Sequence, residues 1–184
     1  LISESKVNDV NISPYGDIYA SCAGGGLSIL PISDVKNPDV KANFFPATLY
    51  IDDFPLIDAK IGFSNNDTSM WAYYQSYGFA KFKVYPEAKH EKVAQIYKSN
   101  NDVICNKIWT DEKGNGWFFC TNGIYILPPD LDSSKMIHIG KDHRLKSEII
   151  DMDICDDGHM WLATGGEGIV KIHNRFVENP SKIT

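Results

Sequence analysis

The sequence predicts an all-β chain made of β-propeller blades, and three observations predict this fold. A short motif led by one large aromatic residue occurs four times along the 184 residues. In every copy, segments of strand length alternate with turns rich in Asp, Asn and Gly. The copies recur at about 45 residues, which is the period of a propeller blade with four antiparallel strands.

The leading aromatic residue defines the repeat. Its four occurrences are Tyr19, Trp71, Trp117 and Trp161, at intervals of 52, 46 and 44 residues. A glycine lies three positions before the aromatic residue in three copies, as Gly16, Gly114 and Gly158, and the second copy has Thr68 there. A second glycine follows in every copy, as Gly26, Gly78, Gly123 and Gly168. We expect the repeat aromatics to pack between blades rather than to bind a ligand.

The elements of each copy follow in a fixed order. A short first strand, such as "LIDAKIGF" or "IIDMDIC", precedes the turn. The second and third strands, such as "MWLAT" and "IVKIH", alternate loosely with the period of two that half-buried strands show. Three copies then reach a proline, Pro31, Pro86 or Pro128, which stops a central strand.

A fourth, weaker strand is predicted in three copies. The segments are "VKANFFPA", "KVAQIYKS" and "KMIHIGK". Residues 87–98 also have helix propensity, but their place in the repeat predicts a strand. The last copy is short, because "NRFVENPSKIT" makes a poor fourth strand.

The whole chain is predicted to be one propeller fragment, residues 1–184, with blades at approximately 7–49, 56–98, 102–139 and 148–184. Propellers close with about four to eight blades, so four lies at the lower limit. An open arc would expose strand edges. We therefore expect part of a larger propeller, completed by the same polypeptide or by a second copy. The start at Leu1, without a signal peptide, indicates an interior or processed piece.

Composition argues against two classes of partner. The net charge is −6, and the only arginines are Arg144 and Arg175, so nucleic acid is not expected. No apolar run approaches the roughly 20 residues that cross a bilayer, so no membrane span is predicted. The chain is 43% hydrophobic and 12% aromatic, which is enough to fill a core.

The fourth copy, "IIDMDICDDGHMWLATGGEGIVKIH" at residues 149–173, resembles the two-component regulator propeller repeat. The third copy matches well, the first has Tyr19 in place of Trp, and the second keeps Trp71 and Gly78. The resemblance implies the sensory region of a membrane-bound hybrid histidine kinase. It also implies a periplasmic or other extracytoplasmic location and the detection of glycan breakdown products.

An enzyme of the sialidase type is a weaker match. Asp156, Gly158 and Trp161 have the spacing of its Asp box, but Ile154 and Met160 replace the Ser and Thr. Two arginines also cannot form the cluster that clamps a substrate carboxylate. We find no catalytic centre in the sequence and predict that this segment is not an enzyme.

Several polar residues have structural explanations. We expect the turn acids Asp111, Asp156 and Asp157 to hydrogen-bond to their own backbone. Asn65, Asp67 and Ser69 alternate as at the start of a calcium loop, but the glycine and the distal Glu of such a loop are missing. No metal site and no cofactor are predicted.

The four cysteines lie in predicted strands. Cys105 and Cys155 are placed in first strands, and Cys22 and Cys120 in second strands. We expect them to be small buried hydrophobic residues rather than disulfide partners. No CxxC pair is present for zinc or redox chemistry.

Residues that depart from the repeat are the candidate ligand site. The second copy carries Tyr73, Tyr74, Gln75 and Tyr77 where small residues are usual. In the third copy Asn106 precedes Trp109, an aromatic residue where the other copies have Phe63, Ser13 and Cys155. Aromatic faces beside amides and hydroxyl groups suit sugars. The alternative is that these side chains fill space between imperfect blades.

The sequence therefore predicts a non-catalytic sensor or ligand-recognition module, with an oligosaccharide as the ligand. The expected partners are the remaining blades or a second propeller, as in a homodimer. A protein-binding propeller scaffold is the alternative, and a glycan-active enzyme ranks third.

Overall fold

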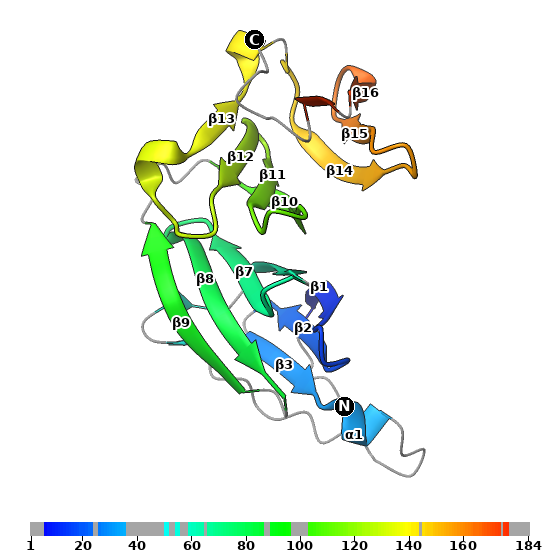
Figure 1. The fold of residues 1–184 in the computed structure, drawn as a ribbon. Coiled ribbons are helices and arrows are strands. Elements are labelled where there is room, and N and C mark those ends of the chain that lie inside the picture. The colour runs from blue at the N-terminus through cyan, green and yellow to red at the C-terminus, as the bar shows by residue number, and fades with distance from the viewer. Residues whose placement is uncertain are drawn as a thin grey trace.

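The computed structural model describes residues 6–23, 26–35, 50–51, 54–55, 59–64, 66–86, 89–96, 103–143, 145–173 and 175–176. Four antiparallel sheets of three or four strands follow one another along a curved arc (Figure 1). Within each sheet the strands lie in sequence order, each beside the next. The prediction of an all-β chain made of propeller blades is confirmed.

The strands have the following bounds. The first sheet contains β1 (Val7–Ile12), β2 (Ile18–Cys22) and β3 (Gly26–Leu30). The second contains β6 (Lys60–Ser64), β7 (Ser69–Tyr74), β8 (Gly78–Tyr85) and β9 (Lys89–Ile96). The third contains β10 (Cys105–Thr110), β11 (Gly116–Cys120), β12 (Gly123–Leu127) and β13 (Ile137–Ile139). The fourth contains β14 (Ile149–Ile154), β15 (Met160–Thr164) and β16 (Gly168–Ile172).

Smaller elements lie between the sheets. They are α1 (Ile32–Val35), the hairpin of β4 (Tyr50–Ile51) with β5 (Phe54–Pro55), and the 3-10 turns η1 (Ser133–Lys135) and η2 (Lys141–His143). No helix in the described ranges is long and apolar enough to cross a membrane.

Two of the predicted fourth strands form. Residues 87–98, which also have helix propensity, contain the strand β9. The third copy contains β13. The first copy's fourth strand, at residues 40–47, falls outside the described residues. The blade boundaries inferred from the repeat stay a prediction.

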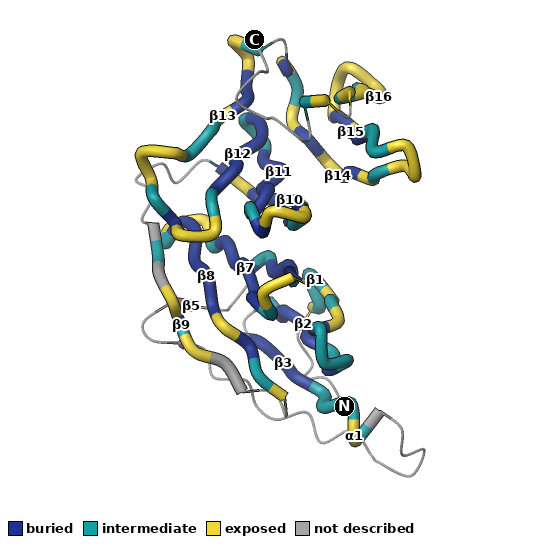
Figure 2. Tube along the Cα trace, viewed as in Figure 1, coloured by how far each residue is buried: buried dark blue, intermediate teal, exposed yellow. Residues whose placement is uncertain are grey.

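Among the described residues the core consists of three apolar layers, one between each pair of neighbouring sheets. Figure 2 shows the consequence, since β7, β8, β11 and β12 are mostly buried while much of β16 is exposed. The layer between the second and third sheets is rich in aromatic side chains. There Phe79 contacts Phe118 edge to face, with ring centroids 4.7 Å apart. Sheets packed face to face around an arc are the arrangement of propeller blades.

The repeat aromatic residue packs against the sheet that follows. Trp71 lies edge to face on Phe118 with 5.8 Å between the ring centroids. A Cβ atom on Gly116 would lie 2.7 Å from the Trp71 ring, so this glycine makes room for the indole. Tyr19, Trp71 and Trp117 are 0% exposed, whereas Trp161 is 38% exposed. In the described part of the chain no sheet follows the fourth, which explains the difference.

The turn between the first and second strands requires a left-handed residue. Gly114 has φ +80° and Gly158 has φ +76°, and Thr68 adopts φ +52° at the same place in the second copy. A β-branched side chain is strained in this conformation. The sheet on either side of the turn therefore imposes the geometry even where the glycine is missing.

Three of the four cysteines are buried, as expected, but the prediction is wrong for Cys155. The strand β14 ends one residue before it. Cys155 instead opens the turn, where its N–H donates to the carbonyl oxygen of His159 at 3.0 Å. Its side chain is exposed because the chain leaves the sheet at this point.

Candidate ligand-binding site

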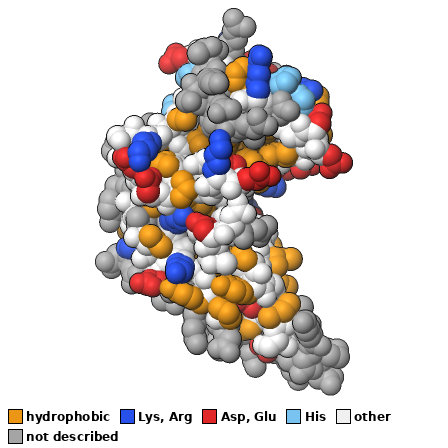
Figure 3. All heavy atoms as spheres, viewed as in Figure 1, with side chains coloured by type: hydrophobic (Ala, Val, Ile, Leu, Met, Phe, Trp, Pro, Cys, Tyr) orange, Lys and Arg blue, Asp and Glu red, His pale blue; other side chains and the backbone are white. Residues whose placement is uncertain are grey.

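The first strands of the sheets meet on the concave side of the arc. There β10 contacts β6 and β14, and β6 contacts β1. Side chains join these strands. The Asn11 amide nitrogen donates to the Ile61 carbonyl oxygen at 3.0 Å, and that of Asn106 donates to the Ile149 carbonyl oxygen at 2.7 Å. In the space-filling view this side appears as a notch (Figure 3).

Three of these first strands contain a register shift at the same position. The shift leaves one extra residue opposite the second strand, namely Asn8 in β1, Asn106 in β10 and Ile150 in β14. Such a bulge bends the strand and re-aims its side chains. The pairing of β6 with β7 is regular, and Lys60 there takes the register position of Asp9, Lys107 and Asp151. At this position the second copy therefore carries a lysine, as the third copy does.

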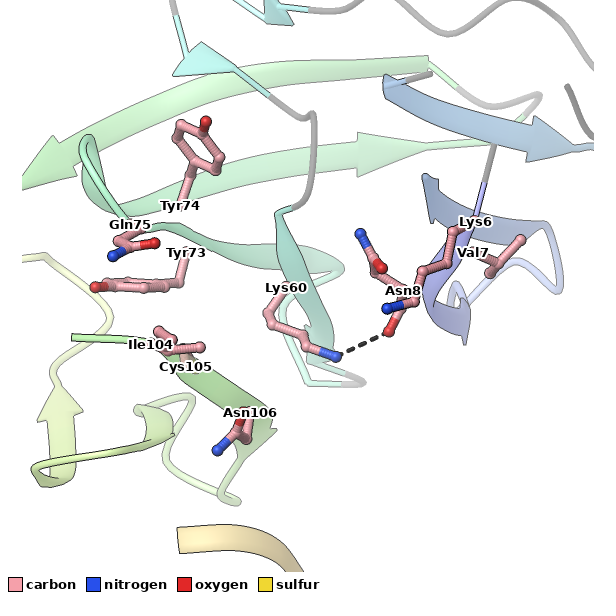
Figure 4. Close-up of a pocket in the computed structure, with 10 residues that line it drawn as sticks. All are labelled: Lys6, Val7, Asn8, Lys60, Tyr73, Tyr74, Gln75, Ile104, Cys105 and Asn106. Atoms are coloured by element: carbon pink, nitrogen blue, oxygen red, sulfur yellow. Dashed lines mark hydrogen bonds between the residues drawn. The ribbon is translucent and has the colours of Figure 1, made fainter. Parts of the chain in front are cut away.

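A hollow of about 580 Å³ opens where these strands begin, and we call it the Lys60 hollow. It is lined by Lys6, Val7, Asn8, Lys60, Tyr73, Tyr74, Gln75, Ile104, Cys105 and Asn106. These residues come from the first three sheets (Figure 4). Its volume lies within the range of about 300–1,000 Å³ that small-ligand sites occupy.

Two lysines give the Lys60 hollow a positive charge. The ammonium group of Lys60 extends toward Asn8 and donates to its carbonyl oxygen at 2.9 Å (Figure 4). Lys6 is the second cation. Among the described residues that line the hollow, none carries a carboxylate or an imidazole. The hollow therefore favours a polar ligand, and an anionic one over a cationic one.

The tyrosines at the end of β7 have different environments. Tyr73 is 2% exposed and its hydroxyl donates to the Val103 carbonyl oxygen at 2.7 Å. Burial raises the pKa of Tyr73 above its usual value, so this hydroxyl stays protonated as a donor. Tyr74 is half-buried, and its ring lies 5.6 Å from that of Tyr77. Tyr74 can therefore offer part of its ring to a ligand. The Tyr73 side chain leaves the opposite face of β7 and packs toward the third sheet (Figure 4).

A second hollow, of about 410 Å³, lies where the same strands end, and we call it the Trp109 hollow. It is lined by Asn11, Gly62, Phe63, Asn66, Lys107, Ile108, Trp109, Thr110, Asp111 and Glu112. Trp109 is half-buried and lies edge to face on Trp117, with 5.7 Å between the ring centroids. The two hollows occupy opposite ends of the first strands.

The structure divides the residues predicted as a ligand site. Tyr73, Tyr74, Gln75 and Asn106 line the Lys60 hollow, and Trp109 lines the other. Tyr77 lines neither hollow in the described residues. It lies behind Tyr74, and its carbonyl oxygen accepts a hydrogen bond from the Gln95 amide at 3.1 Å.

The repeat comparison misplaced Trp109. By register it occupies the position of Asn11, Gly62 and Asp153, which oppose the repeat aromatics of their sheets, and not that of Phe63, Ser13 and Cys155. Trp109 is still an aromatic residue where the other copies have none.

Sequence reasoning missed Lys6, Asn8 and Lys60. Asn8 and Asn106 are equivalent bulge residues, and only Asn106 was singled out. Lys60 takes the register position of Asp9, Lys107 and Asp151, a position that is charged in every copy.

Two of the turn acids, Asp111 and Asp157, and Asp67 of the weak calcium motif have structural partners. The Asp111 carboxylate accepts from the N–H groups of Lys113 and Asn115, at 3.0 and 2.9 Å, and from the Trp117 indole at 2.9 Å. Asp157 accepts from the His159 N–H at 3.1 Å. These turn contacts are as predicted. Asp67 binds the Lys81 ammonium group at 2.7 Å, so a cation already occupies that carboxylate.

No group of three His, Cys, Asp or Glu side chains in the described ranges is placed to hold a metal ion. Among the described residues, the rings of His159 and His173 lie 4.4 Å apart. His159 also contacts the Asp157 carboxylate at 2.9 Å. This pair lies on the fourth sheet, away from both hollows.

No known family matches the chain by sequence, and no curated protein matches it. Solved structures do match its shape. PorZ, a surface component of the type-IX secretion system of Porphyromonas gingivalis, gives a TM-score of 0.67 at 16% identity, over 91% of this chain and 26% of its own. The extracellular domain of a putative hybrid two-component system from B. thetaiotaomicron gives 0.62 at 16% identity, over 90% of this chain and 21% of its own.

A gluconolactonase from Xanthomonas campestris is also similar, with a TM-score of 0.58 at 13% identity, over 92% of this chain and 58% of its own. The shared feature is the β-propeller fold. At these identities the likeness shows the fold alone. The chain spans about a quarter or less of the length of the first two proteins.

Proposed function

We propose that this chain is a non-catalytic sensor module of a two-component signalling protein and that it binds an oligosaccharide in the Lys60 hollow. The observation that carries the proposal is the composition of this hollow. Three sheets bring two lysines, three amide side chains and a half-buried tyrosine ring to one place. Among its described lining residues there is no carboxylate or imidazole to serve as a general acid or base.

The chemistry of the hollow suits a sugar. A ring face such as that of Tyr74 can lie against sugar C–H groups, and the amides of Gln75 and Asn8 can donate to and accept from hydroxyl groups. Lys60 adds a cation that would bind a sugar carboxylate. An acidic oligosaccharide is therefore the preferred ligand over a neutral one.

The fold supports the sensor proposal. The resemblance of the repeat to the two-component regulator propeller and the likeness to an extracellular two-component domain point in the same direction. We place the chain outside the cytoplasmic membrane on the same grounds. Binding would drive signalling only through a difference in affinity between two arrangements of the propeller.

Further blades belong to this proposal. Trp161 is 38% exposed and Ile169 is 73% exposed on the fourth sheet, where the preceding sheets are each covered by a neighbour. At the other end of the arc, Val10 and Ile12 of β1 are 55% and 64% exposed. We propose that additional blades, or a second propeller, cover these faces.

Calorimetric titration with neutral and uronic acid-containing oligosaccharides tests the proposal. We expect saturable binding of an acidic oligosaccharide, weakened by about tenfold or more in Tyr74→Ala and in Lys60→Ala. Tyr85→Ala, a half-buried tyrosine at the end of β8 and outside the hollow, is the matched control and should bind normally. Trp109→Ala distinguishes the two hollows. Equal affinity in the Tyr74, Lys60 and control variants would reject the Lys60 hollow as the site.

A protein-binding scaffold is the second candidate, and the exposed apolar face of the fourth sheet favours it. It predicts no sugar binding and association through that face. In sedimentation experiments the wild type would then form an assembly, and the Ile169→Lys variant would not.

A further inference from the structure

Cys105 and Cys120 lie directly opposite each other on β10 and β11. The next pair along the hairpin is hydrogen-bonded, because the Thr121 N–H donates to the Ile104 carbonyl oxygen at 2.9 Å. In an antiparallel ladder, hydrogen-bonded and non-hydrogen-bonded pairs alternate, and side chains are closest in the latter. Cys105 and Cys120 thus occupy a non-hydrogen-bonded position, whose Cα separation of about 4.5 Å lies within the disulfide range.

The two thiol groups share one environment. Each donates to a carbonyl oxygen on its own strand, Cys105 to Lys107 at 3.2 Å and Cys120 to Phe118 at 3.7 Å. Both belong to the apolar layer that contains Tyr73. Burial, together with the neighbouring Cys120 thiol, raises the pKa of Cys105 well above its usual value. All four cysteines are free thiols in this structure.

Packing alone does not require this pair. The equivalent position holds Val7 opposite Cys22 in the first sheet and Ile149 opposite Thr164 in the fourth. At this cross-strand pair of positions, the first sheet therefore has one cysteine and the fourth sheet has none. Cysteine at both places occurs in the third sheet alone among these three.

We propose that Cys105 and Cys120 form a cross-strand disulfide in the wall of the Lys60 hollow when the chain folds in the presence of an oxidant. The oxidant is a small-molecule or protein disulfide. One cysteine thiolate attacks a sulfur of the oxidant and releases its first thiol, and the second cysteine then displaces the other thiol from the mixed disulfide. The two cysteines lose two protons and two electrons in total, and the oxidant leaves as two thiols.

The place of the pair gives the disulfide a structural consequence. Cys105 lines the Lys60 hollow between Ile104 and Asn106, and Tyr73 packs beside it (Figure 4). A disulfide would fix the start of β10 to the end of β11. The proposal goes beyond ligand binding and does not depend on it.

Refolding in glutathione tests the proposal. The chain is unfolded in urea with a reductant, then refolded in a buffer of oxidised and reduced glutathione, alkylated and mapped by mass spectrometry. We expect a peptide that links Cys105 to Cys120 and about tenfold less alkylation of both than in protein refolded with reductant alone. The exposed Cys155 reports that the oxidant is active, because it should carry glutathione.

Two variants sharpen the test. Val7→Cys places a second cysteine opposite Cys22 in the same register, so it shows whether this position accepts a disulfide. Cys120→Ala must abolish the linked peptide. The proposal is overturned if Cys105 and Cys120 remain fully alkylated while Cys155 carries glutathione.

Discussion

The hydroxyl of Tyr73 donates to the carbonyl oxygen of Val103 at 2.7 Å, which joins the end of β7 to the segment that leads into the third sheet. Both residues are almost fully buried, at 2% and 1% exposure. The same tyrosine lines the Lys60 hollow. One hydrogen bond therefore contributes to the packing of two blades and to the shape of the candidate site.

Replacing Tyr73 by Phe should lower the free energy of unfolding by about 1 kcal/mol, because the change leaves a buried carbonyl oxygen without its donor. Urea denaturation measures the effect. Tyr74→Phe is the matched control, since the half-buried ring leaves that hydroxyl within reach of water. A Tyr73→Phe protein as stable as the wild type would show that the bond contributes nothing.

The repeat aromatics allow a comparison of one residue type in two environments. Trp117→Ala should cost about 3–5 kcal/mol, because it opens a cavity in the layer between the third and fourth sheets. Trp161→Ala should cost about 1 kcal/mol, because 38% of this side chain is exposed and no described sheet covers it. Denaturation of both variants under one set of conditions gives the difference. Equal losses would mean that Trp161 is covered in solution.

Much of the fold could be predicted from the sequence because the repeat residues act locally. A glycine at the first turn, a large aromatic residue in the second strand and a proline after the third each report on their own strand or turn. These signals placed the strands of four sheets correctly, including β9 in spite of its helix propensity. The repeat could be recognised even in the second copy, where the turn glycine is missing, because Thr68 adopts the same turn geometry.

The site was harder to predict because it is assembled from strands far apart in the chain. Tyr73, Tyr74, Gln75 and Asn106 were found because they break the repeat. Lys60 was not found, because a lysine in a predicted strand is normally interpreted as a solvent-exposed side chain. Its place in the hollow depends on the contacts between β6, β1 and β10. These contacts are not visible in residue types alone.

Thr68→Gly should stabilise the protein by up to about 1 kcal/mol, because glycine removes the strain of a β-branched residue at φ +52°. The gain is reduced by the larger backbone entropy that glycine has in the unfolded chain. Thermal denaturation detects the change. The reverse substitution, Gly158→Thr, places the same side chain in the same turn of the fourth sheet and should destabilise. A loss of stability in Thr68→Gly would show that the threonine side chain has a stabilising contact that outweighs the strain.

The ion pair of Lys81 with Asp67 predicts how stability depends on pH. Lys81 is buried, and its ammonium group also donates to the Pro129 carbonyl oxygen of the third sheet at 3.2 Å. Burial raises the pKa of Asp67, but hydrogen bonds from Lys81, Ser69 and Ser64 outweigh it, so the pKa lies below its usual value. A carboxyl group of this kind stabilises the fold above its unfolded pKa, about 3.9.

The stabilisation from Asp67 should therefore be present at neutral pH and should be lost as the pH falls below about 4, through the lowered pKa of the folded state. Because the Asp67 side chain is 39% exposed, solvent screening limits its contribution to about 1 kcal/mol. Urea denaturation of the wild type and of Asp67→Asn between neutral and acidic pH measures it. The two proteins should differ at neutral pH and converge in acid, whereas the exposed turn variant Asp156→Asn should follow the wild type throughout. A constant difference between wild type and Asp67→Asn at every pH would mean that the ionised carboxylate is not what stabilises this contact between the second and third sheets.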